Sequence, residues 1–185
     1  MRRRHPKALP RVWLMTDERM GDALWPAIER LPRGGGIVFR HYATPEAERR
    51  RLFARILVVA RRRGLIVLSA GTRLSGADGM HNPARRAGRC IVTRAAHSRI
   101  EALAALRAGA KLVFVSPVFA TQSHPGARAL GVLRFATMVR GIEERVVALG
   151  GMDATRARCI VKLGVRRWAA IDAWSSGQKR KAVPT

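Results

Sequence analysis

The sequence predicts an α/β fold, a compact (β/α)8 TIM barrel with some shortened helices. Eight apolar runs with strand composition begin near residues 12, 37, 65, 77, 90, 111, 145 and 167, and helical patterns separate most of them. No first strand leads into GxGxxG, which a doubly wound open sheet would favour. Because 185 residues are fewer than the roughly 200 of a usual barrel, at least two outer helices must be short.

The bulk composition indicates one domain with a substantial core, since 48% of the residues are hydrophobic. We expect a basic flexible tail at 1–11, a barrel domain at 12–174 and a second flexible tail at 175–185. No apolar run reaches the roughly 18 residues that cross a bilayer, so we expect a cytoplasmic protein with no membrane partner. Cys90 and Cys159 lack a CxxC spacing and are expected to be buried thiols.

The charge is extreme, with 36 Lys and Arg against 12 Asp and Glu, a formal net charge of +24. Such a field attracts polyanions. The basic runs, however, flank one helix or lie at the chain ends, and aromatic residues make up only 5%. This pattern favours a solvated arginine surface around an anionic small-molecule site, and nucleic acid is not the expected partner.

The first two strand–helix units occupy residues 12–64. A strand at 12–17 precedes a helix at 21–31, and Gly34–Gly36 form a flexible turn before the strand at 37–39. The first helix has apolar residues at helical spacing: Leu24, Ile28 and Leu31.

The helix at 45–64 is the clearest in the chain. Thr44 is expected to be its N-cap, with Pro45 at the first helical position. Arg61–Arg63 before Gly64 favour its end.

Three strands follow at 65–69, 77–81 and 90–97, joined by connections too short for full helices. Ser98 is expected to cap a helix that runs to Gly109. That helix should present one apolar face, formed by Ile100, Leu103 and Leu106.

The last part of the chain repeats the alternation. After a strand at 111–115, we expect a helix at 132–139, a strand at 145–151, a helix at 154–163 and a strand at 167–174. Asp153 should cap the last helix and Gly164 should end it.

The segment Lys111–Gly131 is the first candidate for a functional site, because a strand buried on both faces ends there in a loop of small polar residues. Ligands of parallel α/β folds bind at the carboxyl ends of the strands. Thr121, Ser123 and His124 are therefore candidate site residues. Taken alone, the loop is better interpreted as a solvated turn before Pro125-Gly126.

Ordered motifs at consecutive strand ends change that interpretation. They are MTDER (15–19), Arg40, ADGMH (77–81), AAHSRIEALAALRAGAKLVFVSPVFATQSHPG (95–126) and ALGGM (148–152). In order and spacing they resemble the family of thiamine phosphate synthases and TenI-type thiazole tautomerases, over residues 12–174.

The resemblance implies a thiamine-biosynthesis barrel that binds a small phosphorylated thiazole or pyrimidine and that can form a homodimer. His97 matches the tautomerases' catalytic histidine, and imidazole suits proton transfer near neutral pH. The other residues that match the family imply binding of phosphate or substrate. These residues are Arg40, Thr121, Ser123, His124, Gly150 and Gly151. Gly150-Gly151 would let backbone N–H groups come close to a phosphate.

The chain departs from the synthase pattern at the acidic residues that hold magnesium. In the synthases an Asn-Asp pair ends the third strand, and Ser69-Ala70 stand near that position here. The synthases also have an acidic residue after the histidine of the fourth strand, whereas HNPARR (81–86) has no carboxylate. We therefore expect no metal ligands and no cofactor, with magnesium only if synthase activity is retained. Tautomerase-like proton transfer is the preferred function; a diverged synthase, with acids such as Asp17, Asp78 or Asp172 compensating, and a non-catalytic phosphate- or polyanion-binding barrel remain alternatives.

Overall fold

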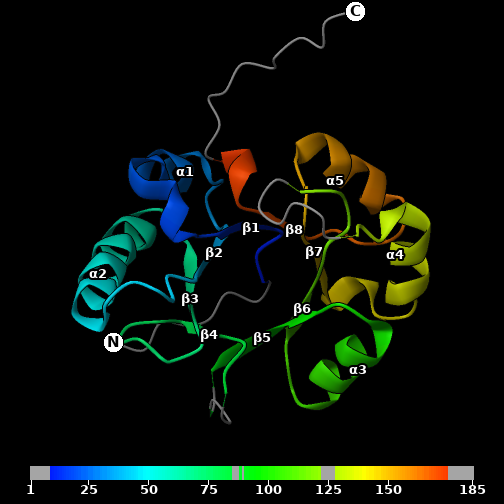
Figure 1. Ribbon diagram of the computed structural model, residues 1–185, viewed down its shortest axis with the longest axis horizontal. Coiled ribbons are helices and arrows are strands. Elements are labelled where there is room, and N and C mark those ends of the chain that lie inside the picture. The colour runs from blue at the N-terminus through cyan, green and yellow to red at the C-terminus, as the bar shows by residue number, and fades with distance from the viewer. Residues whose placement is uncertain (1–8, 85–87, 89, 122–127, 175–185) are drawn as a thin grey trace, which may run out of the picture.

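The structure is a computed structural model that describes residues 9–84, 88, 90–121 and 128–174. Eight parallel strands form a closed barrel in sequence order, and β8 pairs with β1 (Figure 1). The predicted fold is confirmed. The strands are β1 (Val12–Met15), β2 (Gly36–Phe39), β3 (Ile66–Ala70), β4 (Gly79–His81), β5 (Ile91–Ala96), β6 (Leu112–Val115), β7 (Val146–Ala148) and β8 (Trp168–Ala170).

Helices surround the barrel, and their lengths explain how it fits into a short chain. The described residues between β3 and β4, and between β4 and β5, contain no helix, as predicted. The helical segments are η1 (Glu18–Ala23), α1 (Leu24–Arg30), α2 (Glu46–Arg62), α3 (Arg99–Arg107), α4 (Gly131–Val139), η2 (Glu143–Arg145), α5 (Ala154–Val161) and η3 (Asp172–Trp174), where η denotes a 3-10 turn.

The barrel interior is filled by large side chains. The indole of Trp13 meets the ring of Phe114 edge-on, with centroids 5.6 Å apart. Gly36 pairs with Trp13 across β1 and β2, and a Cβ at Gly36 would lie 2.2 Å from the indole. Gly36 is thus a strand residue that makes room for Trp13, and the expected turn at Gly34–Gly36 is wrong at its last position.

Two further clusters of buried apolar residues lie between the barrel and its helices. Leu24, Ile28 and Leu31 are buried, as their spacing predicted. In α3, however, Ala102 and Ala105 form the buried face, whereas Ile100 is 81% exposed. The predicted apolar face of α3 is therefore wrong at Ile100, whereas Leu103 and Leu106 are half-buried and Leu106 packs against the core.

The caps of the helices are mostly as predicted. Ser98 accepts a hydrogen bond from Glu101 N, and Asp153 accepts one from Arg156 N. At α2 the N-cap is Pro45, whose carbonyl accepts from Arg49 N, so the prediction of Thr44 was one residue early.

Several smaller expectations need correction or lie outside the described residues. The last strand ends at Ala170 and continues as η3, and Cys159 is exposed whereas Cys90 is half-buried. The expected tails fall largely in residues 1–8 and 175–185, which the structure does not describe. Within the described part, no helix combines the length and apolar character needed to cross a bilayer.

Candidate functional site

A cavity of about 360 Å³ lies at the carboxyl ends of the strands. The loops that follow the strands supply most of its walls, and this is the end at which barrels of this type bind ligands. Its lining residues are Met15, Arg40, Tyr42, His81, Asn82, Ala95, His97, Ser116, Pro117, Thr121, Leu149, Gly150 and Ile171.

The cavity brings together most of the predicted site residues that the structure describes. Arg40, His97, Thr121 and Gly150 line it, although they come from the ends of four different strands. Gly151 is the next residue but does not line the cavity. Ser123 and His124 lie outside the described residues.

His97 follows β5 and is held by two hydrogen bonds. Its Nδ1 lies 2.8 Å from the carbonyl oxygen of Ser116, and its backbone N–H donates to Glu101 Oε2 over 2.9 Å. A carbonyl oxygen can only accept, so Nδ1 carries the proton in this bond. In the neutral imidazole, Nε2 is then the nitrogen with a free lone pair and can act as a base.

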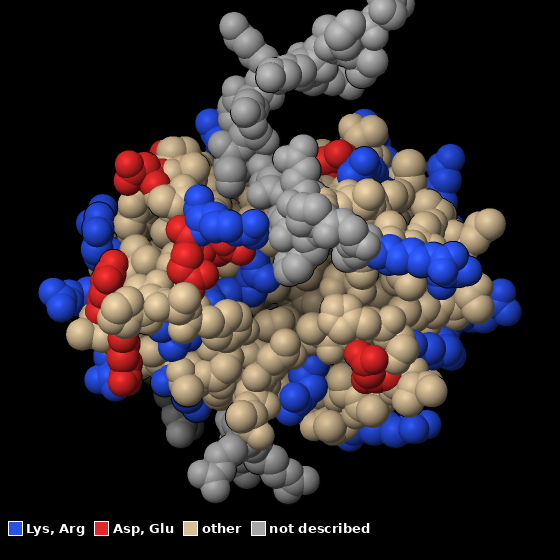
Figure 2. All heavy atoms as spheres, in the orientation of Figure 1, with Lys and Arg blue, Asp and Glu red and all other residues tan. Residues whose placement is uncertain are grey.

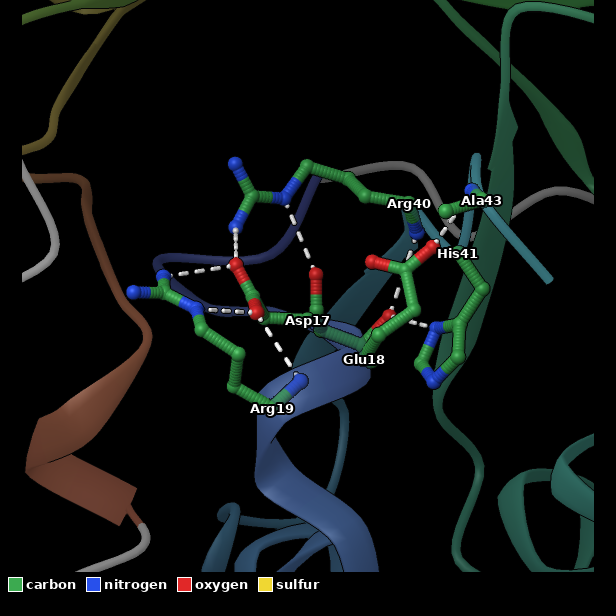
Figure 3. A network of polar contacts seen from close by, with 7 residues as sticks. Asp17, Glu18, Arg19, Arg40, His41 and Ala43 are labelled. Atoms are coloured by element: carbon green, nitrogen blue, oxygen red, sulfur yellow. Dashed lines mark hydrogen bonds and ion pairs between the residues drawn. The ribbon is translucent and has the colours of Figure 1, made fainter.

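Arg40 follows β2 and belongs to a network at the rim of the cavity (Figure 3). Its Nε donates to Thr16 O over 2.9 Å, and its NH2 donates to Asp17 Oδ2 over 3.3 Å. Its NH1 has no partner among the described residues and remains available to a ligand. Burial lowers the pKa of Arg40, which nevertheless stays a cation because guanidinium starts from a very high value.

Asp17 links Arg40 to Arg19. Its Oδ1 accepts from Arg19 Nε over 2.7 Å, and this hydrogen bond is the main reason that the pKa of Asp17 falls to about 2. The carboxylate is ionised and shared by two arginines, so the three side chains carry one net positive charge. This charge suits an anionic ligand.

Gly150 and Gly151 follow β7 and pack tightly against the loop after β6. A Cβ at Gly150 would lie 2.7 Å from Pro117 Cα, and one at Gly151 would lie 2.3 Å from Ala120 O. Both glycines have positive φ, at +92° and +58°. Among the described residues neither N–H group donates a hydrogen bond, so both are available as donors to an anion.

Sequence reasoning missed other cavity residues, notably His81 and Asn82. His81 Nδ1 lies 2.9 Å from Thr93 Oγ1, and burial lowers its pKa to about 3, so the imidazole is neutral. His81 is buried at the end of β4 and also lines the cavity. Asn82 Oδ1 accepts from Ala95 N over 2.8 Å. The signal that could have found both is their position directly at the end of a strand.

The donor set of the cavity does not fit magnesium, which prefers carboxylate oxygens. None of the described lining residues is acidic, and Ser69 and Ala70 at the end of β3 are both fully buried. Of the acids that could compensate, Asp17 is held by two arginines, and Asp78 accepts from Val67 N near the start of β3. Asp172 lies in η3.

A closed (β/α)8 barrel with polar residues from several strand ends around one cavity is a small-ligand barrel of the kind that enzymes use. The particular family follows from comparison with known proteins. The chain belongs to the thiamine monophosphate synthase family, whose model matches residues 14–174. The resemblance seen in the sequence is confirmed.

Individual relatives agree with this assignment. The chain is 30% identical to the thiamine-phosphate synthase of Thermus thermophilus over 184 residues, which cover 89% of each chain. It is 25% identical to the putative thiamine-phosphate synthase 2 of Aquifex aeolicus, covering 88% of this chain and 96% of that one. The solved thiamine phosphate pyrophosphorylase of Pyrococcus furiosus has the same fold, with a TM-score of 0.76, 24% identity and coverage of 91% and 89%.

Proposed function

We propose that this chain is a tautomerase-like isomerase of thiamine biosynthesis that moves a proton on a thiazole phosphate ester, with His97 as the acid–base residue. The observation that carries the proposal is the hydrogen bond from His97 Nδ1 to Ser116 O. This bond fixes the tautomer in which Nε2 is the base, on a side chain that lines the cavity.

The reaction needs only one such group. Nε2 of His97 takes a proton from a carbon atom of the substrate's thiazole ring, and the electrons of that C–H bond move into the conjugated double bonds of the substrate. The imidazolium then returns the proton to a different atom, so that the double bonds are rearranged and substrate and product are isomers. No electron acceptor or metal takes part in these steps.

The phosphate of the substrate is held at the same cavity. Arg40 NH1 supplies a charged donor, Gly150 supplies a backbone N–H, and Thr121 supplies a hydroxyl at the wall. Charge-assisted hydrogen bonds of this kind are the strong ones, and they fix the ester so that its ring meets His97. Ser123 and His124 are further candidates on the same loop.

The alternative is a diverged thiamine phosphate synthase, a transferase that joins hydroxymethylpyrimidine diphosphate to thiazole phosphate. The similarity to the Thermus thermophilus synthase over 89% of both chains favours it. The absence of acidic residues from the described cavity wall favours the isomerase, because a magnesium diphosphate has no carboxylate to bind there.

The test is to follow isomerisation of thiazole carboxylate phosphate by the wild type and by His97→Ala. We expect kcat to fall at least about 100-fold with KM little changed, because a general base contributes about this much. Arg107→Ala, on the exposed C-terminal turn of α3, is the control and should retain activity. Unchanged turnover in His97→Ala would remove His97 from the mechanism, and magnesium-dependent formation of thiamine phosphate in place of isomerisation would select the transferase.

A further inference from the structure

A second cavity, of about 470 Å³, lies outside the barrel between η1–α1 and the beginning of α2. Its volume is in the range of small-molecule sites. It is separate from the cavity at the barrel mouth, since no residue lines both. It is lined by Glu18, Gly21, Asp22, Leu24, Trp25, His41, Ala43, Thr44, Pro45, Glu48, Leu52 and Arg55.

The charge of this cavity is opposite to that of the protein. Three of the twelve acidic residues of the chain, Glu18, Asp22 and Glu48, line it, against one arginine. Most of the acidic surface visible in Figure 2 lies over the same α1–α2 half of the molecule. Among the described residues none of the three carboxylates forms an ion pair, although 36 basic residues are present in the chain.

His41 supplies a second observation, which is independent of the carboxylates. Its side chain stacks on Phe39 and is buried, with 5% of its surface exposed. Its Nδ1 lies 3.1 Å from Oγ1 of Thr16, a fully buried side chain that accepts from Arg40 N. Among the described contacts Nδ1 is the one acceptor within reach of the Thr16 hydroxyl proton, and a buried hydroxyl donates where it can, so Thr16 donates to Nδ1. Nε2 then carries the ring proton, points away from Thr16 (Figure 3) and has no partner among the described residues.

The walls of the cavity are held in place before any ligand arrives. Glu18 Oε1 accepts from Ala43 N over 2.8 Å and joins η1 to the segment before α2. The Arg55 guanidinium lies 4.7 Å from the Trp25 ring centroid and joins α2 to α1. Arg55 thus packs on an aromatic ring and does not pair with the nearby carboxylates, which leaves their charge for a ligand.

We propose that this cavity binds a small organic cation that carries a protonated amino group and a separate hydrogen-bond acceptor. The positive charge of the amino group is attracted to the carboxylates of Glu18, Asp22 and Glu48, which are spread along the cavity wall. The acceptor meets Nε2–H of His41, and the apolar part packs against Leu24 and Leu52. The ligand is organic because the described residues contain no group of three or more His, Cys, Asp or Glu placed to hold a metal ion.

The probe for this site is 2-(aminomethyl)pyridine, which is a cation with one ring-nitrogen acceptor. Its binding is followed by amide chemical shifts in the full-length protein. We expect saturable shifts at residues 18–25 and 41–55 and none at Ala95 or Leu149 of the barrel mouth. Benzylamine lacks the acceptor and should bind several-fold more weakly, and pyridine-2-carboxylate, an anion, should not bind.

The matched variants are Asp22→Asn/Glu48→Gln and Glu29→Gln/Glu144→Gln, which remove the same number of charges inside and outside the cavity. All four side chains are exposed or half-exposed at the surface, so the fold should survive. We expect the first variant to weaken binding about tenfold and the second to leave it unchanged. Equal binding by both variants, or shifts confined to the barrel mouth, would overturn the proposal.

Discussion

Arg40 and Asp17 are joined at the rim of the barrel mouth, with Arg40 NH2 3.3 Å from Asp17 Oδ2. The pair orients the guanidinium, since Nε is simultaneously fixed on Thr16 O. Among the described contacts NH1 makes no hydrogen bond, so both of its N–H groups remain open to a ligand. The Arg40 guanidinium is therefore a donor in a fixed orientation and not a mobile surface charge, because the side chains of Arg40 and Asp17 are both less than one-fifth exposed.

The first prediction concerns the open side of Arg40. Arg40→Gln should weaken the binding of a thiazole phosphate ester about tenfold or more, because a charge-assisted hydrogen bond contributes about 1.5–3 kcal/mol. Isothermal titration measures the change. Arg50→Gln, which alters an exposed arginine paired with Glu46 on α2, is the control and should bind like the wild type. Equal affinity for Arg40→Gln would place the phosphate elsewhere.

The second prediction concerns Asp17, the carboxylate that pairs with Arg40 and Arg19. The pKa of Asp17 in the folded chain is about 2, below the ordinary 3.8, mainly through its hydrogen bond from Arg19. A lowered carboxyl pKa stabilises the fold above the ordinary pKa, and the stabilisation is lost as the pH falls from about 4 through 2. Asp17→Asn should therefore cost about 1–2 kcal/mol at pH 7 after allowance for solvent screening. Denaturant unfolding should show this difference shrinking toward pH 2, and a constant difference would contradict the assignment.

The fold could be predicted because most strands are short, largely apolar runs, which a parallel sheet covered by helices can bury. The N-caps Ser98 and Asp153 could also be predicted from the sequence, since an N-cap depends only on one side chain and the first turn of the helix that follows it. The α3 face could be predicted from spacing only in part, since Leu103 and Leu106 are half-buried but Ile100 is exposed. Ile100 and Ala102 are both apolar, and only the close approach of the helix to the barrel decides that the smaller one is buried.

The convergence of several candidate residues on one cavity could be predicted, but their geometry could not. Positions at strand ends indicated that Arg40, His97 and Gly150 would meet, because the carboxyl ends of parallel strands share one edge. The tautomer of His97 depends on Ser116, which lies on the next strand's loop. His41 depends in the same way on Thr16, which is 25 residues away in the chain and hydrogen-bonds its Nδ1.

The third prediction concerns the buried imidazole of His81. Burial lowers its pKa from the ordinary 6.5 to about 3, so the folded chain keeps it neutral where the unfolded chain takes up a proton. Stability is therefore complete above about pH 6.5 and declines as the pH falls toward 3. The lowered pKa of His41, also caused mainly by burial, acts in the same direction. Unfolding free energies at pH 7.5, 6 and 4.5 should fall in that order, and less steeply in His81→Gln; an unchanged slope in this variant would show that His81 does not titrate as described.

The last prediction isolates a steric contact with a matched pair of glycines. Gly150 and Gly109 both have φ of +92°, but a Cβ at Gly109 meets nothing within 4 Å, whereas one at Gly150 meets Pro117 Cα at 2.7 Å. Gly109→Ala should cost only the backbone strain, about 1–2 kcal/mol. Gly150→Ala should cost about 1–3 kcal/mol more, because a backbone atom must move.

The contact between Gly150 and Pro117 should also affect the rate of the isomerisation. Pro117 follows Ser116, whose carbonyl holds Nδ1 of His97, so a methyl group at Gly150 that displaces Pro117 also disturbs the bond that fixes the base. We expect Gly150→Ala to lower kcat for the isomerisation at temperatures where the variant remains folded, and Gly109→Ala to leave kcat unchanged. Thermal unfolding and turnover measured on the same samples separate the two effects. Equal losses of stability in the two variants would mean that the loop after β6 yields to the added methyl group, and that Gly150 contributes only its backbone conformation.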